Sequence, residues 1–280
     1  MSYILNGFLD EYCRKGGDGK DGMDDILRMT TREVKERIIG PNTKDYQSSF
    51  CDMLQATNHP AFGAMANVFV SHAHGCEFWN TIHAVKRCLS KDNNKDYEDV
   101  VVWMDVFSIN QHQPNVWTTD WLFDTFQDAI KEIGRTIMVT SPWNHPIRSW
   151  CIFEVYSTLH TGSKFDIAIG EDDEKQFLKD VLTAKDDNDA MSVMNRLFST
   201  IRAENSQCTS DEDQRRIFQV IRDKVRFEEI DKMVLDACVK RLITVVKEFL
   251  DKPAGQEGTD VERKRARLES IVRRLQHQRH

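Results

Sequence analysis

The chain has 280 residues, of which 40% are hydrophobic and 30% charged, enough for a packed core in one or two domains. The formal net charge of −7 excludes the overall basic character of a general nucleic-acid-binding protein. No stretch reaches the roughly 18 apolar residues of a membrane-spanning helix. The first residues lack the basic start and long apolar run of a secretory signal, and the seven scattered cysteines favour free thiols, so we expect a cytoplasmic protein.

The first 65 residues predict an N-terminal helical extension. Within it, the stretch from Thr31 to Ile39 has the pattern of a helix. We expect this helix to stop at Gly40-Pro41, because glycine and proline both disfavour the interior of a helix.

Residues 66–170 alternate between short apolar runs and helical patterns, which predicts an α/β domain with a parallel sheet. The runs are continuous rather than alternating, as in strands buried on both faces. The predicted strands are 66–71, 99–105, 135–141 and 164–170. Helical spacing appears after the first strand in Phe78, Ile82, Val85 and Leu89, and after the second in Leu122, Phe126, Ala129, Ile130 and Ile133. The second of these helices should begin after Thr118 or Thr119 and end at Gly134.

A third helix should follow the third strand, with Ser149 as its N-cap and Gly162 at its end. Its apolar face would consist of Ile152, Val155, Tyr156 and Leu159. Glu154 falls off that apolar stripe, so we expect it at the margin of the helix and not in the core.

Beyond Gly170 the patterns are helical, at 172–183, 187–203, 211–224 and 228–251. We therefore assign 171–252 to a mainly helical region, followed by a polar hinge and charged helical tail at 253–280. The segment 261–280 carries seven Lys or Arg residues and two Glu. The simplest interpretation is a solvated helix, and the alternative is a basic tail that contacts an acidic partner.

Candidate site residues follow the ends of the predicted strands, because ligands of open parallel sheets bind outside the carboxyl ends of the strands. They are Ser71 and His72 after the first strand, Asp105 after the second and Trp143 after the third. Glu154 would face the same crevice between Trp150 and Trp143. Apolar surroundings would raise its pKa and the helix N-terminus would lower it, so the direction of the shift stays open.

Other patterns are weaker. The segment SHAHGC could supply His72, His74 and Cys76 as metal ligands, but no fourth ligand stands at finger-like spacing, and we expect no metal. Cys151 could pair with His72 or His145 as a nucleophile, or be a small packed residue. Glu154 could itself be an ordinary carboxylate on a helix surface. Neither a GxGxxG motif nor a P-loop is present in the sequence.

The segment VFVSHAHGCEFWNTIHAVKRCL resembles the opening of a TIR (Toll/interleukin-1 receptor) domain. VVVWMD, ending in Asp105, resembles the second strand of that domain. TIMVTSPWNHPIRSWCIFEV resembles its strand and Ser-x-Trp-Cys-x-x-Glu helix, with Ser149, Trp150, Cys151 and Glu154 in matching order. The resemblance covers about residues 66–170 and implies a flavodoxin-like parallel sheet.

WMDVFSINQHQ resembles the Trp-x-Asp-x-x-x-x-Asn-Gln signature of fungal heterokaryon-incompatibility (HET) domains. The matching residues are Trp103, Asp105, Asn110 and Gln111. The two families are distantly alike, so both resemblances can apply to this chain.

The TIR resemblance implies an NAD⁺ nucleosidase in immune or cell-death signalling, with Glu154 as the catalytic residue. NAD⁺ would be the substrate, no cofactor would be needed, and the TIR-like part would form a homo-oligomer. The residues expected to contact NAD⁺ are Ser71, His72, Asp105, Trp117, Trp143, Trp150 and Cys151. The alternatives are a non-catalytic signalling adaptor, with 103–121 as its interaction surface, and an enzyme acting on another nucleoside substrate.

Overall fold

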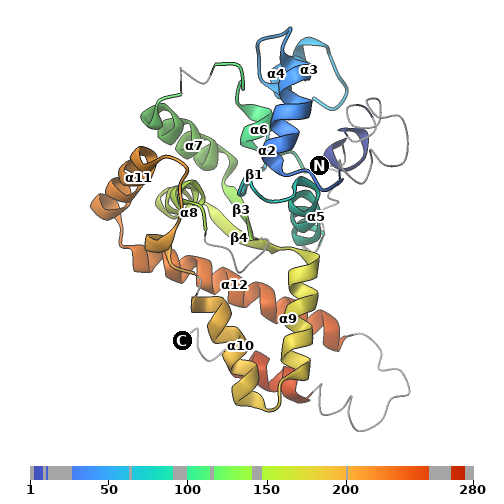
Figure 1. Ribbon diagram of the computed structural model, residues 1–280, viewed down its shortest axis with the longest axis vertical. Coiled ribbons are helices and arrows are strands. Elements are labelled where there is room, and N and C mark those ends of the chain that lie inside the picture. Colours follow the sequence, from blue (N-terminus) through green and yellow to red (C-terminus); the bar gives the residue numbers. More distant parts are fainter. Residues whose placement is uncertain are drawn as a thin grey trace.

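The computed structural model describes residues 3–8, 11, 27–62, 65–90, 100–113, 117–140, 147–199, 201–251 and 266–274. Its centre is a parallel sheet with the strand order β2-β1-β3-β4 (Figure 1). The strands are β1 (Val68–Ser71), β2 (Val102–Trp103), β3 (Arg135–Thr140) and β4 (Lys164–Ile169). The predicted α/β class, with a parallel sheet flanked by helices, is confirmed.

Helices connect the strands and surround the sheet. Before and between the strands they are α2 (Thr31–Val34), α3 (Gly40–Thr43), α4 (Phe50–Ala56), α5 (Phe78–Leu89), α6 (Asp105–Ser108), α7 (Thr119–Ile133) and α8 (Ser149–Thr161). After β4 they are α9 (Glu171–Thr183), α10 (Asp187–Ser199), α11 (Asp211–Lys224) and α12 (Phe227–Leu250). Short π-helices η1 (Tyr3–Gly7) and η4 (Lys35–Ile39) and the 3₁₀ turn η7 (Ala203–Asn205) complete the set.

The sheet divides the apolar interior into two clusters, because successive side chains of a strand point to opposite faces. Phe69 and Met138 face the cluster that contains α7, α8, α11 and α12. Val70 and Ile137 face the cluster that contains α5 and the N-terminal helices. Each face of the sheet is therefore covered by helices of the 66–170 region and also by helices that lie outside it in the sequence.

The N-terminal segment departs from the expected break at Gly40-Pro41. The π-helix η4 runs directly into α3, and Gly40 donates its N–H to the carbonyl of Lys35, five residues back. A wider π turn accommodates a proline that a regular α-helix would not. The side chains of Asn42 and Thr43 then bond the carbonyls of Ile38 and Ile39, both at 2.8 Å, and so satisfy groups near the proline.

The second strand also differs from expectation. β2 covers only Val102 and Trp103, and both side chains are half-buried, because this strand lies at the edge of the sheet. Asp105, expected at the end of a strand, instead begins the short helix α6. The other three strands and the helices between them lie where they were predicted, and Gly134 and Gly162 end α7 and α8 with positive φ angles of 72° and 68°.

Helix α8 is more buried than its pattern suggested. Every residue from Cys151 to Thr158 is buried, because α7, α11, α12 and the sheet all contact this helix. Leu159, assigned to the apolar face, is instead 36% exposed. Ser149 is not the N-cap: Arg148 precedes the first turn, and the hydroxyl of Ser149 lies 3.0 Å from that of Ser206.

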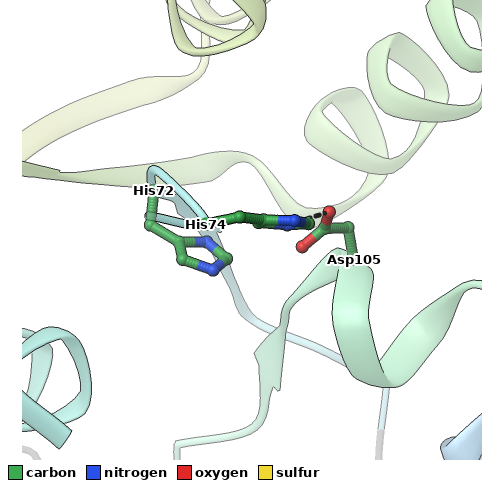
Figure 2. Close-up of side chains that lie close together, drawn as sticks. All are labelled: His72, His74 and Asp105. Carbon is green, nitrogen blue, oxygen red and sulfur yellow. Dashed lines mark hydrogen bonds and ion pairs between the residues drawn. The ribbon is translucent and has the colours of Figure 1, made fainter. Parts of the chain in front are cut away.

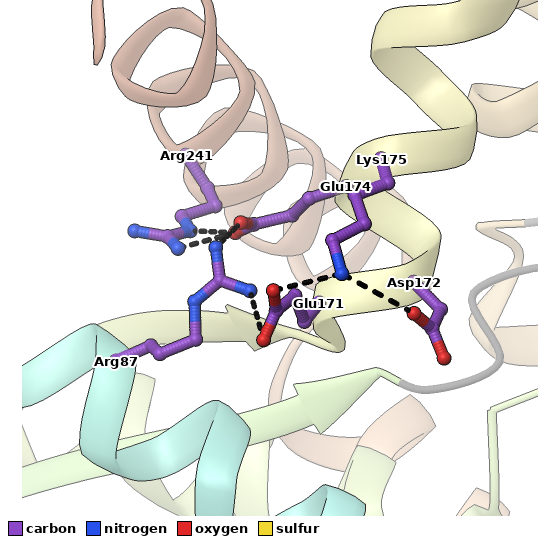
Figure 3. A network of polar contacts seen from close by, with 6 residues as sticks. All are labelled: Arg87, Glu171, Asp172, Glu174, Lys175 and Arg241. Atoms are coloured by element: carbon purple, nitrogen blue, oxygen red, sulfur yellow. Dashed lines mark hydrogen bonds and ion pairs between the residues drawn. The ribbon is translucent and has the colours of Figure 1, made fainter. Parts of the chain in front are cut away.

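A buried ion-pair network joins α9 and α12 to α5 (Figure 3). Glu174 of α9 receives a 2.7 Å hydrogen bond from Nε of Arg241, and its other oxygen pairs with Arg87 of α5. At the exposed margin Glu171 pairs with Lys175 at 2.9 Å. These contacts anchor helices that extend away from the sheet in Figure 1.

The helix at 266–274 is not simply solvated. Leu268 and Ile271 are fully buried in the cluster that contains α8 and α12. Arg267 donates to the carbonyl of Lys185 at 3.1 Å, just past the end of α9. None of the helices in the described ranges is long and apolar enough to span a membrane.

Candidate functional site

The carboxyl ends of β1 and β3 meet at the point where the winding of the sheet changes direction. From β1 the chain passes to β2 on one side, and β3 pairs with β1 on the other, so the direction of winding changes between these two strands. In open parallel sheets this switch point is where ligands bind. Ser71 ends β1, and Thr140 ends β3 two residues beyond the partner of Ser71.

A polar seam runs between α8 and the sheet, from the carboxyl end of the strands toward their amino end. The hydroxyl of Thr158 is 2.8 Å from that of Thr136 in β3 and 2.7 Å from the carbonyl of Glu154. Glu154 lies one turn before Thr158, on the same side of α8, and therefore also faces the sheet. Sequence analysis placed Glu154 at the helix margin, but it is only 7% exposed.

Several polar atoms of the seam lack a hydrogen bond of ordinary geometry, although the hydroxyl of Ser71 lies close enough to Glu154 and Cys151 to lower their pKa values. Oε2 of Glu154, Oγ of Ser71 and Oγ1 of Thr140 are buried, and none of them has a hydrogen-bond partner of ordinary geometry in the described part of the chain. Buried polar groups in folded proteins are nearly always paired. Three such groups without an ordinary hydrogen bond near the carboxyl end of the sheet therefore require an explanation.

The environment of Glu154 decides the direction of its pKa shift. Burial raises the pKa well above its usual value, nearby Ser71 opposes the rise, and the charge of Asp105 adds to it. Desolvation therefore outweighs the helix N-terminus, and the carboxyl group is held in its neutral form beyond its normal titration range.

Cys151 lies beside this group but is a poor nucleophile. Burial raises the pKa of its thiol far above the usual range, and the charge of Glu154 raises it further. A thiol that resists ionisation is not a reactive cysteine. The structure thus favours the packed-residue interpretation of Cys151, and His145 lies outside the described residues.

Two histidines and an aspartate lie together after the carboxyl ends of β1 and β2 (Figure 2). His72 and His74 lie in the loop after β1, and Asp105 begins α6 just after β2. Nε2 of His74 is 2.7 Å from Oδ2 of Asp105. Nε2 of His72 is buried and has no partner among the described residues.

The charges of this group are unequal. Burial lowers the pKa of His72 to about 4, so its ring is neutral at physiological pH. Burial alone would raise the pKa of Asp105, but the charge and hydrogen bond of His74 lower it well below its usual range. The result is an ionised carboxylate next to one paired and one unpaired imidazole.

The N-terminal segment holds the histidine loop in place. The backbone N–H of Arg32 donates to the carbonyl of His74, and that of Thr31 to the carbonyl of Cys76, both at 2.9 Å. An isolated β-bridge joins Thr30 to Glu77. The loop is therefore shaped by residues far away in the sequence.

The tryptophans expected to line the site are distributed differently. Trp150 packs against Phe123 and Phe126 of α7, with ring centroids 5.6 Å away in each case. Trp117 stacks on Trp121 at 6.5 Å, at the start of α7. Trp143 lies outside the described residues.

The residues of the HET-like signature mainly support the fold around Asp105. Trp103 stacks on Phe69 at 4.6 Å, within the sheet. Gln111 donates to the carbonyl of Asp105 at 3.1 Å, and Asn110 donates to the carbonyl of Gln47 at 2.7 Å. These contacts fix the end of α6 and attach it to the N-terminal segment.

From the sequence, His74 was considered only as a weak candidate metal ligand, and Thr140 was not considered at all. The His-x-His spacing after the first strand was a usable signal, but its third member comes from the second strand and not from Cys76. Thr140 had no signal in the sequence, since threonine is common at the end of a strand.

A hollow lined by Gln214, Phe218 and Arg222 among others lies on α11, away from the candidate site.

The comparisons with known proteins place the chain in no group: no protein family, curated protein or solved structure matches it significantly.

Proposed function

We propose that the chain is a TIR-like NAD⁺ nucleosidase that cleaves the bond between nicotinamide and ribose, with Glu154 as its catalytic residue. The observation that carries the proposal is the buried carboxyl group of Glu154, with one oxygen lacking an ordinary hydrogen bond, near Ser71 at the switch point of the sheet. The strand order 2-1-3-4 is the one expected of a flavodoxin-like sheet, which the TIR resemblance also implies.

The chemistry suits a single carboxylate. Nicotinamide leaves as a neutral pyridine, so the main barrier is the positive charge that develops on the ribose. A carboxylate in a buried site stabilises that charge strongly, because little solvent screens it. Water attack would give ADP-ribose, and attack by the adenine of the substrate would give a cyclic product.

The raised pKa of Glu154 fits this role. Without substrate, a neutral Glu154 avoids the desolvation cost of a buried charge. The cationic nicotinamide ring of bound NAD⁺ would favour loss of the proton from Glu154. Since ionised Glu154 is the active form, kcat/KM should rise with pH until the pKa of the free enzyme is passed.

The deciding experiment is incubation of the full chain with NAD⁺ and chromatographic identification of nicotinamide, ADP-ribose and cyclic products. We expect Glu154→Gln to lower turnover at least about 100-fold, the scale of losing one electrostatic contact to a transition state. Glu171→Gln, which changes a carboxylate that is 57% exposed in its side chain, serves as the matched control. Equal turnover by Glu154→Gln and the unaltered chain would refute the proposal.

Self-association is part of the proposal, with a cytoplasmic signalling role. If neighbouring chains complete the site, activity per chain should increase with protein concentration. The alternative function is a non-catalytic adaptor. Trp117 stacks on the partly exposed Trp121, and this pair would form part of its interaction surface. That function predicts no NAD⁺ consumption, together with assemblies that Trp121→Ser disrupts.

A further inference from the structure

We propose that His72, His74 and Asp105 bind one divalent transition-metal ion of the zinc type. One ligand atom from each residue lies within 4.8 Å of the other two. They follow the carboxyl ends of two adjacent strands, β1 and β2, and backbone hydrogen bonds from Thr31 and Arg32 hold the histidine loop. Two imidazoles and one carboxylate are a common protein ligand set for zinc and for non-haem iron.

His72 is the observation that points to a ligand. Its side chain is buried, and Nε2 has no partner within the described ranges. The backbone carbonyl of Val70 interacts with the ring and, since Nε2 is unpaired, it accepts from Nδ1. Metal-binding histidines are usually oriented in this way, with one nitrogen donating to a carbonyl and the other presenting its lone pair.

Binding an ion requires the ligand atoms to move, because they are spread within 4.8 Å of one another. A tetrahedral zinc ion with bonds of about 2.0 Å holds neighbouring ligand atoms about 3.3 Å apart. His74 and Asp105 are 2.7 Å apart and would separate by about 0.6 Å as the ion replaces the proton between them. Figure 2 shows the ring of His74 directed at the carboxylate of Asp105, with the ring of His72 beside it on the same loop.

The surroundings support the carboxylate and leave room for a further ligand. Oδ1 of Asp105 accepts the N–H of Val106 at 2.8 Å, which fixes its orientation. Two neutral imidazoles and one carboxylate leave a divalent ion with a net charge of +1. Three protein ligands are also typical of sites that keep a fourth position for water or an oxygen atom of a substrate.

The test uses the full chain after removal of bound metal with a chelator. Zn²⁺ is titrated by calorimetry, and Co²⁺ by visible absorption, which reports the geometry around the ion. We expect one ion per chain, with affinity lowered more than about 10-fold in His74→Gln and in Asp105→Asn. Both residues are partly exposed, and circular dichroism checks that each variant is folded.

Matched controls separate this site from adventitious binding. His83→Gln removes an exposed histidine of α5, and Cys76→Ser removes the thiol nearest in sequence, so both should bind the ion normally. Absence of stoichiometric binding, unchanged affinity in the two site variants, or loss only in Cys76→Ser would overturn the proposal. Glu154→Gln should still bind the ion, so this result is independent of nicotinamide release.

Discussion

Two buried glutamates show opposite solutions to the same physical problem. Glu174 is 2% exposed, and both of its oxygens pair with arginines from α5 and α12. Glu154 is 7% exposed, and one of its oxygens has no partner in the described residues. The first carboxylate is paired with arginines on both oxygens, whereas burial raises the pKa of the second well above its usual value and favours its neutral form.

The difference indicates which cluster is structural and which is available for a ligand. A carboxylate with partners on both oxygens connects elements and has little capacity left to bind a ligand. An incompletely paired group destabilises the fold, and such departures from local rules occur preferentially at functional sites. The network around Glu174 therefore explains how the helices after β4 are attached, and the seam around Glu154 marks the candidate site.

The largest expected change in the free energy of unfolding comes from removing the paired carboxylate of Glu174. Glu174→Gln should lower the free energy of unfolding by about 3–5 kcal/mol, because it leaves the buried guanidinium of Arg241 without a counter-charge. Urea unfolding followed by circular dichroism measures the change. Glu171→Gln, at the exposed end of the same network, should change it by less than about 1 kcal/mol. Similar losses in the two variants would contradict the distinction drawn between the clusters.

Removing the carboxyl group of Glu154 should instead raise the free energy of unfolding at neutral pH. Between the normal pKa near 4.5 and the raised pKa of folded Glu154, unfolding releases a proton, so stability falls as pH rises. The slope is up to about 1.4 kcal/mol per pH unit. Glu154→Gln cannot ionise, and it should match the unaltered chain near pH 4 and exceed it progressively at higher pH. A difference in unfolding free energy that does not depend on pH would show that Glu154 ionises normally.

The smallest effect compares two hydroxyls of the seam. Thr158→Val removes a hydroxyl that lies 2.8 Å from Thr136, and it should cost about 1 kcal/mol. Ser71→Ala removes a hydroxyl without an ordinary partner in the described chain, and it should change stability by at most about 0.5 kcal/mol. Thermal unfolding of both variants at one pH decides the comparison, and an equal or larger loss in Ser71→Ala would assign that hydroxyl a structural role.

Local patterns were sufficient to predict most of the elements. The apolar runs located three strands well, and Gly134 and Gly162 ended their helices as expected, because positive φ angles favour glycine. The break at Gly40-Pro41 was wrong, since a π turn absorbs the proline, and local composition does not reveal such a turn. β2 was predicted too long, because an apolar run does not distinguish an edge strand from a central one.

The site was predictable in position but not in environment. Asp105 was found because it follows a predicted strand, and Glu154 because it lies in the helix after the third strand and matches the Ser-x-Trp-Cys-x-x-Glu pattern. The burial of Glu154 depends on α11 and α12, which cover α8 from more than fifty residues away in the chain, and the helical pattern of α8 contains no trace of them. The contact between His74 and Asp105 was not predictable for the same reason, because it depends on the pairing of β1 with β2.

The attachment of the histidine loop to the N-terminal segment has an evolutionary consequence. Arg32 and His74 are joined through main-chain atoms, and a backbone hydrogen bond makes no demand on the identity of either side chain. Related chains could replace Arg32 freely and still hold the loop in the same shape. Correlated substitution would then fail to reveal the contact, and the ancestry of the site would have to be traced through shared backbone geometry.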